Sequence, residues 1–460
     1  MAVFVEKSLG DLVMKVLQVL NHFLPQQTAG TEVYVWALSK HLQRMGIQAE
    51  IIIPNYGLEQ SAHYEYDGLK VFQFAEPSMV DRSLIMGFRK PDGLAAFEKH
   101  LIERKPDVVH FHELAGSNGI TIHHVKAAKN KGARVMMTFH LAGYTCKTGT
   151  LVYKEKDLCN GKINIEKCSA CHLHKRTNRV VRPMLKYVSK QLYHAGVDTT
   201  KWNNKMGTAL GTGFVIEKLK KHFEYLISEC DKVVVLTQWY EKMLLLNGVP
   251  VEKIVYVPQG LAFSATTQVF TECTESTLPL RLVFIGRIGP LKGLHLLIDA
   301  VLRLPEGKIS LHIYGQSGDA DYENDLRHKS DSHLNIQWKG KLPQEKVLPV
   351  LREHDILCLP STFSEMSPFV IQEAFAAGIP VLASNVYGNA EQITDGKNGW
   401  LFKFNDAEDL AIKLKMLINQ PSLIDHAKKY LPPVIDFNSI AIEYNILYKK
   451  ILNLDTHEIN

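Results

Sequence analysis

The feature that most constrains the fold of this chain is a regular alternation of short apolar runs with longer amphipathic stretches. In the first half of the chain the runs are five or six residues long and rich in Val, Ile and Leu. They lie at residues 15–20, 49–53, 107–112, 135–140, 232–236 and 253–257. Apolar runs that alternate with stretches of helical period are typical of βα units, whose strands form parallel sheets.

A second series of apolar runs begins at residue 280. Each run ends at a glycine or a small polar residue, and the runs lie at residues 280–286, 309–315, 334–340, 356–361 and 381–384. Open α/β sheets bind ligands in the loops that follow the carboxyl ends of their strands. We therefore expect binding residues to follow these runs.

Two series of strands predict two α/β domains. The first covers residues 1–262 and carries an insertion at about residues 142–212, where the alternation stops. Residues 263–279 are rich in Thr, Ser and Glu without a clear period, and we interpret them as a linker to the second domain at residues 280–434. Residues 435–460 predict a C-terminal helix that crosses back to the first domain. Its expected apolar side contains Ile440, Ile442, Tyr444, Ile446 and Leu447.

Composition narrows the class of protein. The chain has 460 residues, 46% hydrophobic and 22% charged, which is enough for ordinary buried cores. Its net charge of +5 is too small to predict nucleic acid as a partner and is compatible with an anionic substrate or membrane surface. No apolar run approaches the roughly 18 residues of a membrane-spanning helix, and Glu6 and Asp11 argue against a secretory signal. We expect a cytoplasmic protein, free or peripheral at the inner face of the cell membrane.

The most informative segment reads SEMSPFVIQEAFAAGIPVLAS. Pro368 suits the first turn of a helix that Ser367 caps, and Gly378 suits the left-handed end of that helix. Glu365 then lies on the loop that enters the helix, and Glu373 lies within an otherwise apolar helix. An unpaired buried carboxylate is costly, so Glu373 needs partners. A ribose diol offers two hydrogen-bond donors, while a lysine partner or exposure to solvent is the alternative.

This segment is preceded by FIGRIGPLKGLHLLIDA and followed by GNAEQI and DGKNGWLF. Together these motifs resemble the donor site of family 4 retaining glycosyltransferases, also called glycosyl transferases group 1, over most of residues 280–402. The resemblance implies an α/β GT-B fold with two Rossmann-like domains facing a cleft, here with a Cys-containing insertion in the first domain. It also implies that Arg287 and Lys292 bind the donor pyrophosphate, where two cations stabilise the leaving nucleoside diphosphate.

The same resemblance assigns roles around the two glutamates. Glu373 is expected to bind the ribose of the donor. Glu365 is expected to contact the transferred sugar and to form the catalytic site with His140. The segment that follows Glu365 is expected to bind the donor as well, through Met366, Ser367, Pro368 and Phe369.

The amino-terminal half departs from the family pattern at two places. The loop NHFLPQQTAGTEVYV resembles the glycine loop of the family, but Ala29 replaces its first glycine and only Gly30 remains. One glycine still allows the backbone to approach a phosphate or a sugar. His112 and His140 each end an apolar run, and the resemblance implies that His140 contacts the donor sugar and His112 the sugar or acceptor. Leu141 stands where the family has an aspartate, so the role of that aspartate is in doubt.

These residues predict a retaining glycosyltransferase. Its expected donor is a UDP-, GDP- or ADP-linked sugar, and its expected acceptor is a hydroxyl of a glycan or lipid-linked molecule in cell-surface polysaccharide or glycoconjugate synthesis. No catalytic metal is expected, because Arg287 and Lys292 supply positive charge. Two alternatives stay open: a non-catalytic sugar-binding or scaffold protein on the GT-B fold, and a GT-B phosphorylase or epimerase.

Four of the seven cysteines gather in the insertion, namely Cys146, Cys159, Cys168 and Cys171. The last two form a C-x2-C pair, and four thiolates match a closed tetrahedral zinc site. Such a zinc would be structural and would stabilise a loop too polar to fold around its own core. An iron–sulfur cluster or redox-active disulfides are the alternatives.

A basic stretch, HKRTNRVVRPMLKYVSKQLY, follows the cysteines. Near helical spacing it carries Lys175, Arg176, Arg179, Arg182, Lys186 and Lys190, with Val and Leu between them. This pattern predicts either a solvated helix face or a surface that binds anionic lipid or a diphospholipid-linked acceptor.

Overall fold

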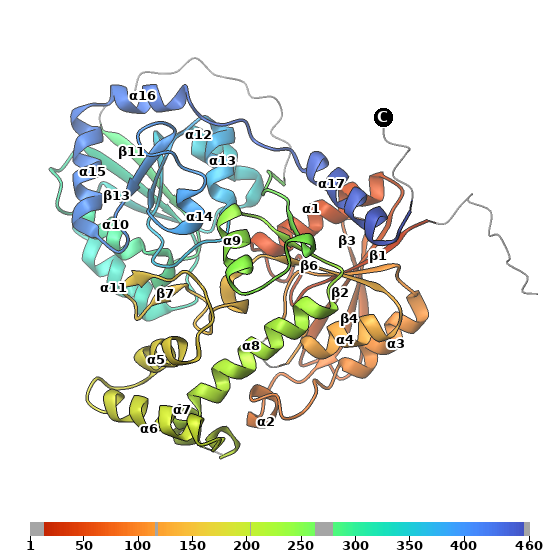
Figure 1. Ribbon diagram of the computed structural model, residues 1–460. Helices are drawn as coiled ribbons and strands as arrows, with labels where there is room; N and C mark the ends of the chain where they lie inside the picture. The colour runs from red at the N-terminus through yellow and green to blue at the C-terminus, as the bar shows by residue number, and fades with distance from the viewer. Residues whose placement is uncertain (1–12, 116–117, 203, 263–278, 455–460) are drawn as a thin grey trace, which may run out of the picture.

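The computed structural model describes residues 13–115, 118–202, 204–262 and 279–454. The predicted linker at residues 263–279 therefore lies outside the described residues, except for Pro279. Figure 1 shows two bodies, each with a sheet flanked by helices. This arrangement confirms the predicted α/β fold with two Rossmann-like domains.

The first sheet is built from the apolar runs of the amino-terminal half. Its strands have the order β10-β9-β6-β5-β1-β2-β4-β3, and all neighbouring strands pair in parallel except β4 and β3, which are antiparallel. Strands β3 and β4 add a hairpin that the predicted runs do not contain. The strands are β1 (Lys15–Val19), β2 (Gln48–Tyr56), β3 (Ala62–Tyr66), β4 (Leu69–Glu76), β5 (Val108–Phe111), β6 (Arg134–Phe139), β9 (Lys232–Val235) and β10 (Ile254–Tyr256).

Helices connect these strands and cover the sheet (Figure 1). Helix α1 (Gly30–Arg44) follows β1, close to the predicted position, and its buried face carries Val33, Leu38 and Leu42. The others are α2 (Arg82–Ile85), α3 (Leu94–Arg104), α4 (Ile122–Asn130), α8 (Thr212–Glu229) and α9 (Gln238–Leu246).

The second sheet has six parallel strands in the order β13-β12-β11-β14-β15-β16. Because β11 and β14 are neighbours, the loops at their carboxyl ends lie side by side. The strands are β11 (Leu280–Ile285), β12 (Ile309–Tyr314), β13 (Ile336–Gly340), β14 (Ile356–Leu359), β15 (Val381–Ser384) and β16 (Gly399–Phe402). The helices are α10 (Leu294–Val301), α11 (Ala320–Ser330), α12 (Val347–Arg352), α13 (Phe369–Ala377), α14 (Tyr387–Ala390), α15 (Ala407–Asn419) and α16 (Ser422–Lys428).

The last helix, α17 (Phe437–Ile451), packs on α1 of the first domain (Figure 1). Its buried face consists of Phe437, Ile440, Ala441, Tyr444, Leu447, Tyr448 and Ile451. Ile442 and Ile446 are exposed, so their predicted place on the apolar side is wrong. The reason is helical geometry, because each lies two residues from Tyr444 and therefore on the opposite face at 3.6 residues per turn.

The insertion leaves the first sheet after β6. It forms a hairpin of β7 (Val152–Tyr153) and β8 (Asp157–Leu158), then α5 (Ile165–Arg176), α6 (Arg182–His194), the 3-10 turn η2 (Thr199–Lys201) and α7 (Lys205–Leu210). The basic stretch was expected on one helix but spans two, because Thr177 is extended and Pro183 lies in the first turn of α6. Within the described ranges, no helix combines the length and apolar character that crossing a bilayer requires.

Candidate functional site

The segment with the two glutamates connects β14 to α13. Helix α13 begins at Phe369, with Pro368 as its N-cap, and no side chain caps it. The predicted cap by Ser367 is therefore wrong, because extended Pro368 itself occupies the cap position. Gly378 ends the helix at φ 84°, the left-handed conformation that favours glycine. Glu365 thus lies on the loop and Glu373 on the helix.

Glu365 is the centre of a buried polar cluster. Its Oε1 accepts hydrogen bonds from Lys292 Nζ at 2.6 Å and from Ser361 Oγ at 2.7 Å. Lys292 ends the turn η4 (Pro290–Lys292) after β11, and Ser361 follows β14, so neighbouring strand ends bring the three residues together. Lys292 was expected to bind the donor pyrophosphate and Glu365 to contact the transferred sugar. In the structure these two residues form an ion pair with each other.

Glu373 is buried on α13 and takes a partner that the sequence did not indicate. Gln344, in the 3-10 turn η5 (Gln344–Lys346) that precedes α12, donates its Nε2–H to Glu373 Oε1 at 2.6 Å. Burial raises the pKa of the Glu373 carboxyl to about 7, and the bond from Gln344 opposes that rise. Neither a lysine nor solvent compensates this carboxylate, so both alternatives from the sequence are wrong.

The buried Glu373 carboxyl is expected to make the stability of the fold depend on pH. Its pKa is about 7 in the folded chain, against 4.5 as the ordinary value, so the folded state binds the proton more tightly. Its stabilising effect is present below pH 4.5 and is lost as the pH rises through about 7. We predict that Glu373→Gln raises the free energy of unfolding by about 3 kcal/mol at pH 8.

The difference should vanish at pH 4, where the carboxyl is protonated in both states. Chemical denaturation at both pH values measures it. Glu345→Gln, a change at an exposed neighbour, is the matched control and should alter stability at neither pH. Equal stability of Glu373→Gln and the parent chain at pH 8 would contradict the prediction.

Arg287 follows β11 on the loop before η4. Its side chain is exposed and forms no hydrogen bond or ion pair with any residue that the structure describes. It does not join Lys292, Glu365 or Glu373 in direct contact. An unpaired guanidinium at a strand end is a ready ligand for a phosphate.

The loop of Glu365 packs against the first domain through both of its flanks. Ser364 N donates to Thr150 O of the insertion at 3.0 Å, and Trp239 Nε1 donates to Met366 O at 3.4 Å. At the start of α13, the Phe369 ring lies against Gly30, where an added Cβ would be 3.4 Å from it. The segment predicted to bind the donor therefore lies between the domains.

Gly388, which the sequence did not indicate as a functional residue, packs closely against the backbone of this loop. Gly388 begins the GNAEQI motif on α14, and a Cβ added there would be 2.2 Å from Glu365 O and 2.4 Å from Met366 O. Any side chain at residue 388 would therefore displace the loop backbone. Gly293, after Lys292, is also obligatory, because φ is 69° and a Cβ would be 1.8 Å from Pro360 O.

The two predicted histidines lie in contact at the ends of β5 and β6. His112 Nδ1 and His140 Nε2 are 3.0 Å apart, and His112 Nε2 is 2.7 Å from Gln18 Oε1 of β1. The amide oxygen only accepts, so His112 Nε2 carries a proton and His112 Nδ1 accepts from His140. Burial lowers the pKa of His140 to about 3 and that of His112 well below its usual value, so both are neutral.

The histidine pair belongs to a longer buried network that reaches α17. Gln18 Nε2 is 3.4 Å from Tyr448 Oη, which is 2.7 Å from His110 Nδ1. A second branch joins His110, Thr138, Tyr444 and Tyr34 with contacts of 2.8, 2.9 and 2.9 Å. The Tyr34 ring returns to His140, edge on at 4.9 Å between ring centroids. The sequence signal for this network was the presence of polar residues inside apolar runs, namely Gln18, His110 and Thr138.

Two carboxyls near the start of α1, buried Glu32 and partly buried Glu113, were also missed. Glu32 accepts a hydrogen bond from Gln27 Nε2 at 2.6 Å, and burial raises the pKa of Glu32 to about 7, with the charge of Glu113 adding to the effect. Burial likewise raises the pKa of Glu113, which follows His112. Glu32 lies in the first turn of α1, the helix whose Gly30 faces Phe369, and Glu113 hydrogen-bonds to Thr31 of that turn from the loop after β5.

The four cysteines of the insertion line one cavity of about 20 Å³, together with lysines of the same segment. Cys168 Sγ accepts from Asn164 N at 3.5 Å and Cys171 Sγ from Lys154 N at 3.4 Å. All four are free thiols. Among the described residues, no group of three or more His, Cys, Asp or Glu side chains is placed to hold a metal ion. Zinc at Cys146, Cys159, Cys168 and Cys171 thus stays a prediction.

Metal analysis tests that prediction directly. Protein purified without chelator should contain about one zinc per chain, and Cys168→Ser with Cys171→Ser should lose it. Cys230→Ser, a change at a buried cysteine outside the insertion, is the matched control and should keep the zinc. The absence of zinc from the parent chain would contradict the prediction, and iron in its place would favour a cluster.

Two family models match the two domains. The model for glycosyl transferases group 1 matches residues 274–431, and the model for the glycosyl transferase 4-like domain matches residues 29–186. Together they cover more than half of the chain. The chain therefore belongs to the group 1 glycosyltransferases.

Individual relatives agree with this membership. Amylovoran biosynthesis glycosyltransferase AmsK of Erwinia amylovora is 28% identical over 221 residues, 46% of this chain and 53% of AmsK. Glycogen synthase of Mycobacterium tuberculosis is 25% identical over 227 residues, 47% of this chain and 53% of the synthase. The chain thus spans about half the length of the curated relatives it matches.

Solved structures share the fold over nearly the whole chain. Anabaena HepE in complex with UDP and glucose has a TM-score of 0.61 at 14% identity, covering 95% of this chain and 100% of HepE. Sucrose-phosphate synthase from Thermosynechococcus elongatus has a TM-score of 0.64 at 15% identity, covering 96% and 99%. At these identities the likeness shows the GT-B fold alone.

Proposed function

We propose that the chain is a retaining glycosyltransferase with a nucleotide-sugar donor and an acceptor hydroxyl on a glycan or lipid-linked molecule. The observation that carries this proposal is the Lys292–Glu365–Ser361 cluster at neighbouring strand ends, on a loop that packs against the first domain. The name of AmsK, an amylovoran biosynthesis glycosyltransferase, supports a role in polysaccharide synthesis. The UDP bound to HepE supports a donor that carries a nucleoside diphosphate. We place the reaction in the cytoplasm, or at the inner face of the cell membrane.

The charges of the site fit a diphosphate leaving group. Lys292 already holds one carboxylate, and Arg287 is exposed nearby in sequence without a protein partner among the described residues. A donor pyrophosphate between these cations would be stabilised as its bond to the sugar breaks. Two fixed cations can supply this stabilisation in place of a catalytic metal, so we propose that transfer needs none.

The transfer step needs no nucleophile from the protein. The bond from the anomeric carbon to the diphosphate breaks, and the acceptor oxygen bonds to the same face of that carbon. The proton of the acceptor hydroxyl passes to an oxygen of the leaving phosphate. In this scheme Glu365 holds the sugar and Glu373 holds the ribose. Neutral His140 donates its Nε2–H to His112, so its Nδ1 is left to accept a hydrogen bond from a sugar hydroxyl without adding charge.

The configuration of the product tests the retaining proposal. NMR of the transferred or hydrolysed sugar should show the same anomeric configuration as the donor, and activity should persist when no divalent metal ion is added. An inverted product would contradict retention. Release of a sugar phosphate with inorganic phosphate as co-substrate would instead identify a phosphorylase.

The non-catalytic alternative receives less support from the site. A scaffold protein has no need of a buried Glu373 whose charged form is disfavoured, or of Lys292 and Glu365 paired beside an interdomain surface. Binding of a nucleotide sugar without any release of nucleoside diphosphate would favour that alternative.

A further inference from the structure

We propose that the insertion carries a docking surface for an anionic lipid bilayer. The α6–α7 surface, as we name it, consists of the exposed side chains of Val180, Met184, Tyr187, Trp202 and Met206 with the basic residues around them. These five side chains are between 48% and 83% exposed. The surface belongs neither to the cluster around Glu365 nor to the contacts between the domains.

Helix α6 presents two different faces. Leu185 and Ser189 are buried toward the rest of the insertion, while Met184 and Tyr187 face solvent. Met184 and Tyr187 are spaced i and i+3 on α6, so they share one face of the helix. Val180 is exposed in the turn just before α6 and extends this apolar stripe along the chain. Exposed apolar residues scattered singly are ordinary, but a stripe beside further exposed apolar side chains marks an interaction site.

Neighbouring elements extend the stripe. Helix α6 packs on α7, and η2 packs on α7, so Trp202 at the end of η2 and Met206 of α7 belong to the same packed unit as α6. In the first domain, Arg82 of α2 donates to Thr200 O at 3.1 Å and to Thr208 Oγ1 at 2.8 Å, so the α2 loop joins the same region. Figure 1 shows α2, α6 and α7 together at the lower end of the molecule.

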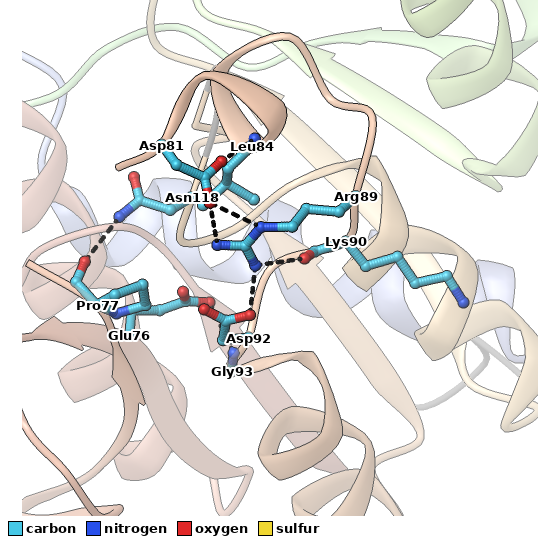
Figure 2. A network of polar contacts seen from close by, with 9 residues as sticks. All are labelled: Glu76, Pro77, Asp81, Leu84, Arg89, Lys90, Asp92, Gly93 and Asn118. Atoms are coloured by element: carbon cyan, nitrogen blue, oxygen red, sulfur yellow. Dashed lines mark hydrogen bonds and ion pairs between the residues drawn. The ribbon is translucent and has the colours of Figure 1, made fainter. Parts of the chain in front are cut away.

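The loop around α2 also exposes apolar side chains, next to a network of polar contacts that we call the frame. Met79, Ile85 and Phe88 are each more than half exposed. Figure 2 shows the frame, in which Arg89 bridges Asp81 and Asp92, and Asp81 caps the N–H of Leu84. The Asp81–Arg89 pair measures 3.0 Å and joins the two ends of the segment that carries Ile85 and Phe88.

The positive charge of the α6–α7 surface favours an anionic partner. Residues 179–206 contain six Lys and Arg, a single Asp and no Glu. Arg179, Lys186, Lys201 and Lys205 are exposed among the apolar side chains. Tyr and Trp with Lys and Arg are the residues that favour the interface of an anionic membrane. A second copy of the chain is disfavoured, because a symmetric contact would bring two positive surfaces together.

The insertion that carries this surface begins directly after β6 and His140, and its Thr150 O accepts a hydrogen bond from Ser364 N beside Glu365. The α6–α7 surface thus offers a way to reach acceptors that are anchored in lipid. That use depends on the proposed function, but binding to the bilayer does not.

Vesicle sedimentation of the full chain tests the inference, without any sugar nucleotide, so its result is independent of transferase activity. Vesicles of phosphatidylcholine with about a third phosphatidylglycerol should sediment the protein at low salt. Pure phosphatidylcholine or high salt should reduce the partition coefficient at least about tenfold. Met184→Ser with Tyr187→Ser and Trp202→Ser should lower it by a similar factor, and so should Lys186→Glu with Lys205→Glu.

The matched control is Leu334→Ser with Ile412→Ser, which removes two exposed apolar side chains of the second domain and should leave binding unchanged. Circular dichroism confirms that each variant is folded. Failure of the parent chain to bind anionic vesicles would overturn the proposal. Equal loss in the control pair would also overturn it, as would a result in which the α6 variants abolish a dimer instead of vesicle binding.

Discussion

Lys292→Ala is expected to lower kcat/KM for sugar transfer by about a thousandfold, because it removes a cation that stabilises the leaving diphosphate. It is also expected to lower the free energy of unfolding by about 3 kcal/mol, because Glu365 then stays buried without its ion-pair partner. Steady-state kinetics and chemical denaturation measure the two effects separately.

A double variant separates stability from catalysis. Lys292→Ala with Glu365→Gln removes both charges, so most of the lost stability should return while activity stays lost. Lys413→Ala breaks the more exposed Lys413–Asp395 pair of 3.4 Å and is the matched control, with little effect on either quantity. Recovery of activity in the double variant would show that Lys292 acts only by neutralising Glu365.

Glu373→Gln is expected to weaken binding of the nucleoside diphosphate by about tenfold to a hundredfold, because charge-assisted hydrogen bonds to the ribose become neutral ones. The same substitution is expected to stabilise the free protein at pH 8, since it removes a buried carboxylate. Calorimetric titration measures the binding, and Glu345→Gln again serves as control.

The opposite signs of these two effects identify a binding residue. A residue with only a structural role would lose stability and binding together. If Glu373→Gln binds the nucleotide as tightly as the parent chain, the ribose assignment is wrong. Glu373→Ala should abolish transfer, because it removes the hydrogen-bond acceptor altogether.

The parts of the site that the sequence predicts are those with local signals. The apolar runs predict the strands, and Gly378 predicts the end of α13, because backbone conformation there depends on neighbouring residues. The positions of Glu365 on a loop and Glu373 on a helix follow from the same local pattern. The resemblance to group 1 glycosyltransferases added roles, and the family matches agree with that resemblance.

The contacts between side chains of the site could not be predicted from the sequence, because they depend on strand order and on how the helices pack. Lys292 meets Glu365 only because β11 and β14 are neighbours in the sheet. Gln344 meets Glu373 across α12 and α13, which pack together. No local pattern encodes either contact.

The network behind the histidines shows the same limit over a longer distance in the sequence. The sequence predicted only that Tyr444 and Tyr448 lie on a C-terminal helix, with Tyr444 on its apolar side. Their hydroxyls instead contact Thr138 and His110, and through Gln18 they connect to His112. A tyrosine at a helical apolar position packs its ring, and its hydroxyl partner depends on the tertiary fold.

The central claim is that the surface between the two domains binds and activates a nucleotide sugar. Release of nucleoside diphosphate from UDP-, GDP- and ADP-sugars, measured with the parent chain and with Lys292→Ala, tests it most directly. We predict slow hydrolysis of at least one donor by the parent chain and loss of that hydrolysis in the variant. No binding and no hydrolysis of any of these donors by the folded parent chain, or equal hydrolysis by Lys292→Ala, would contradict the claim.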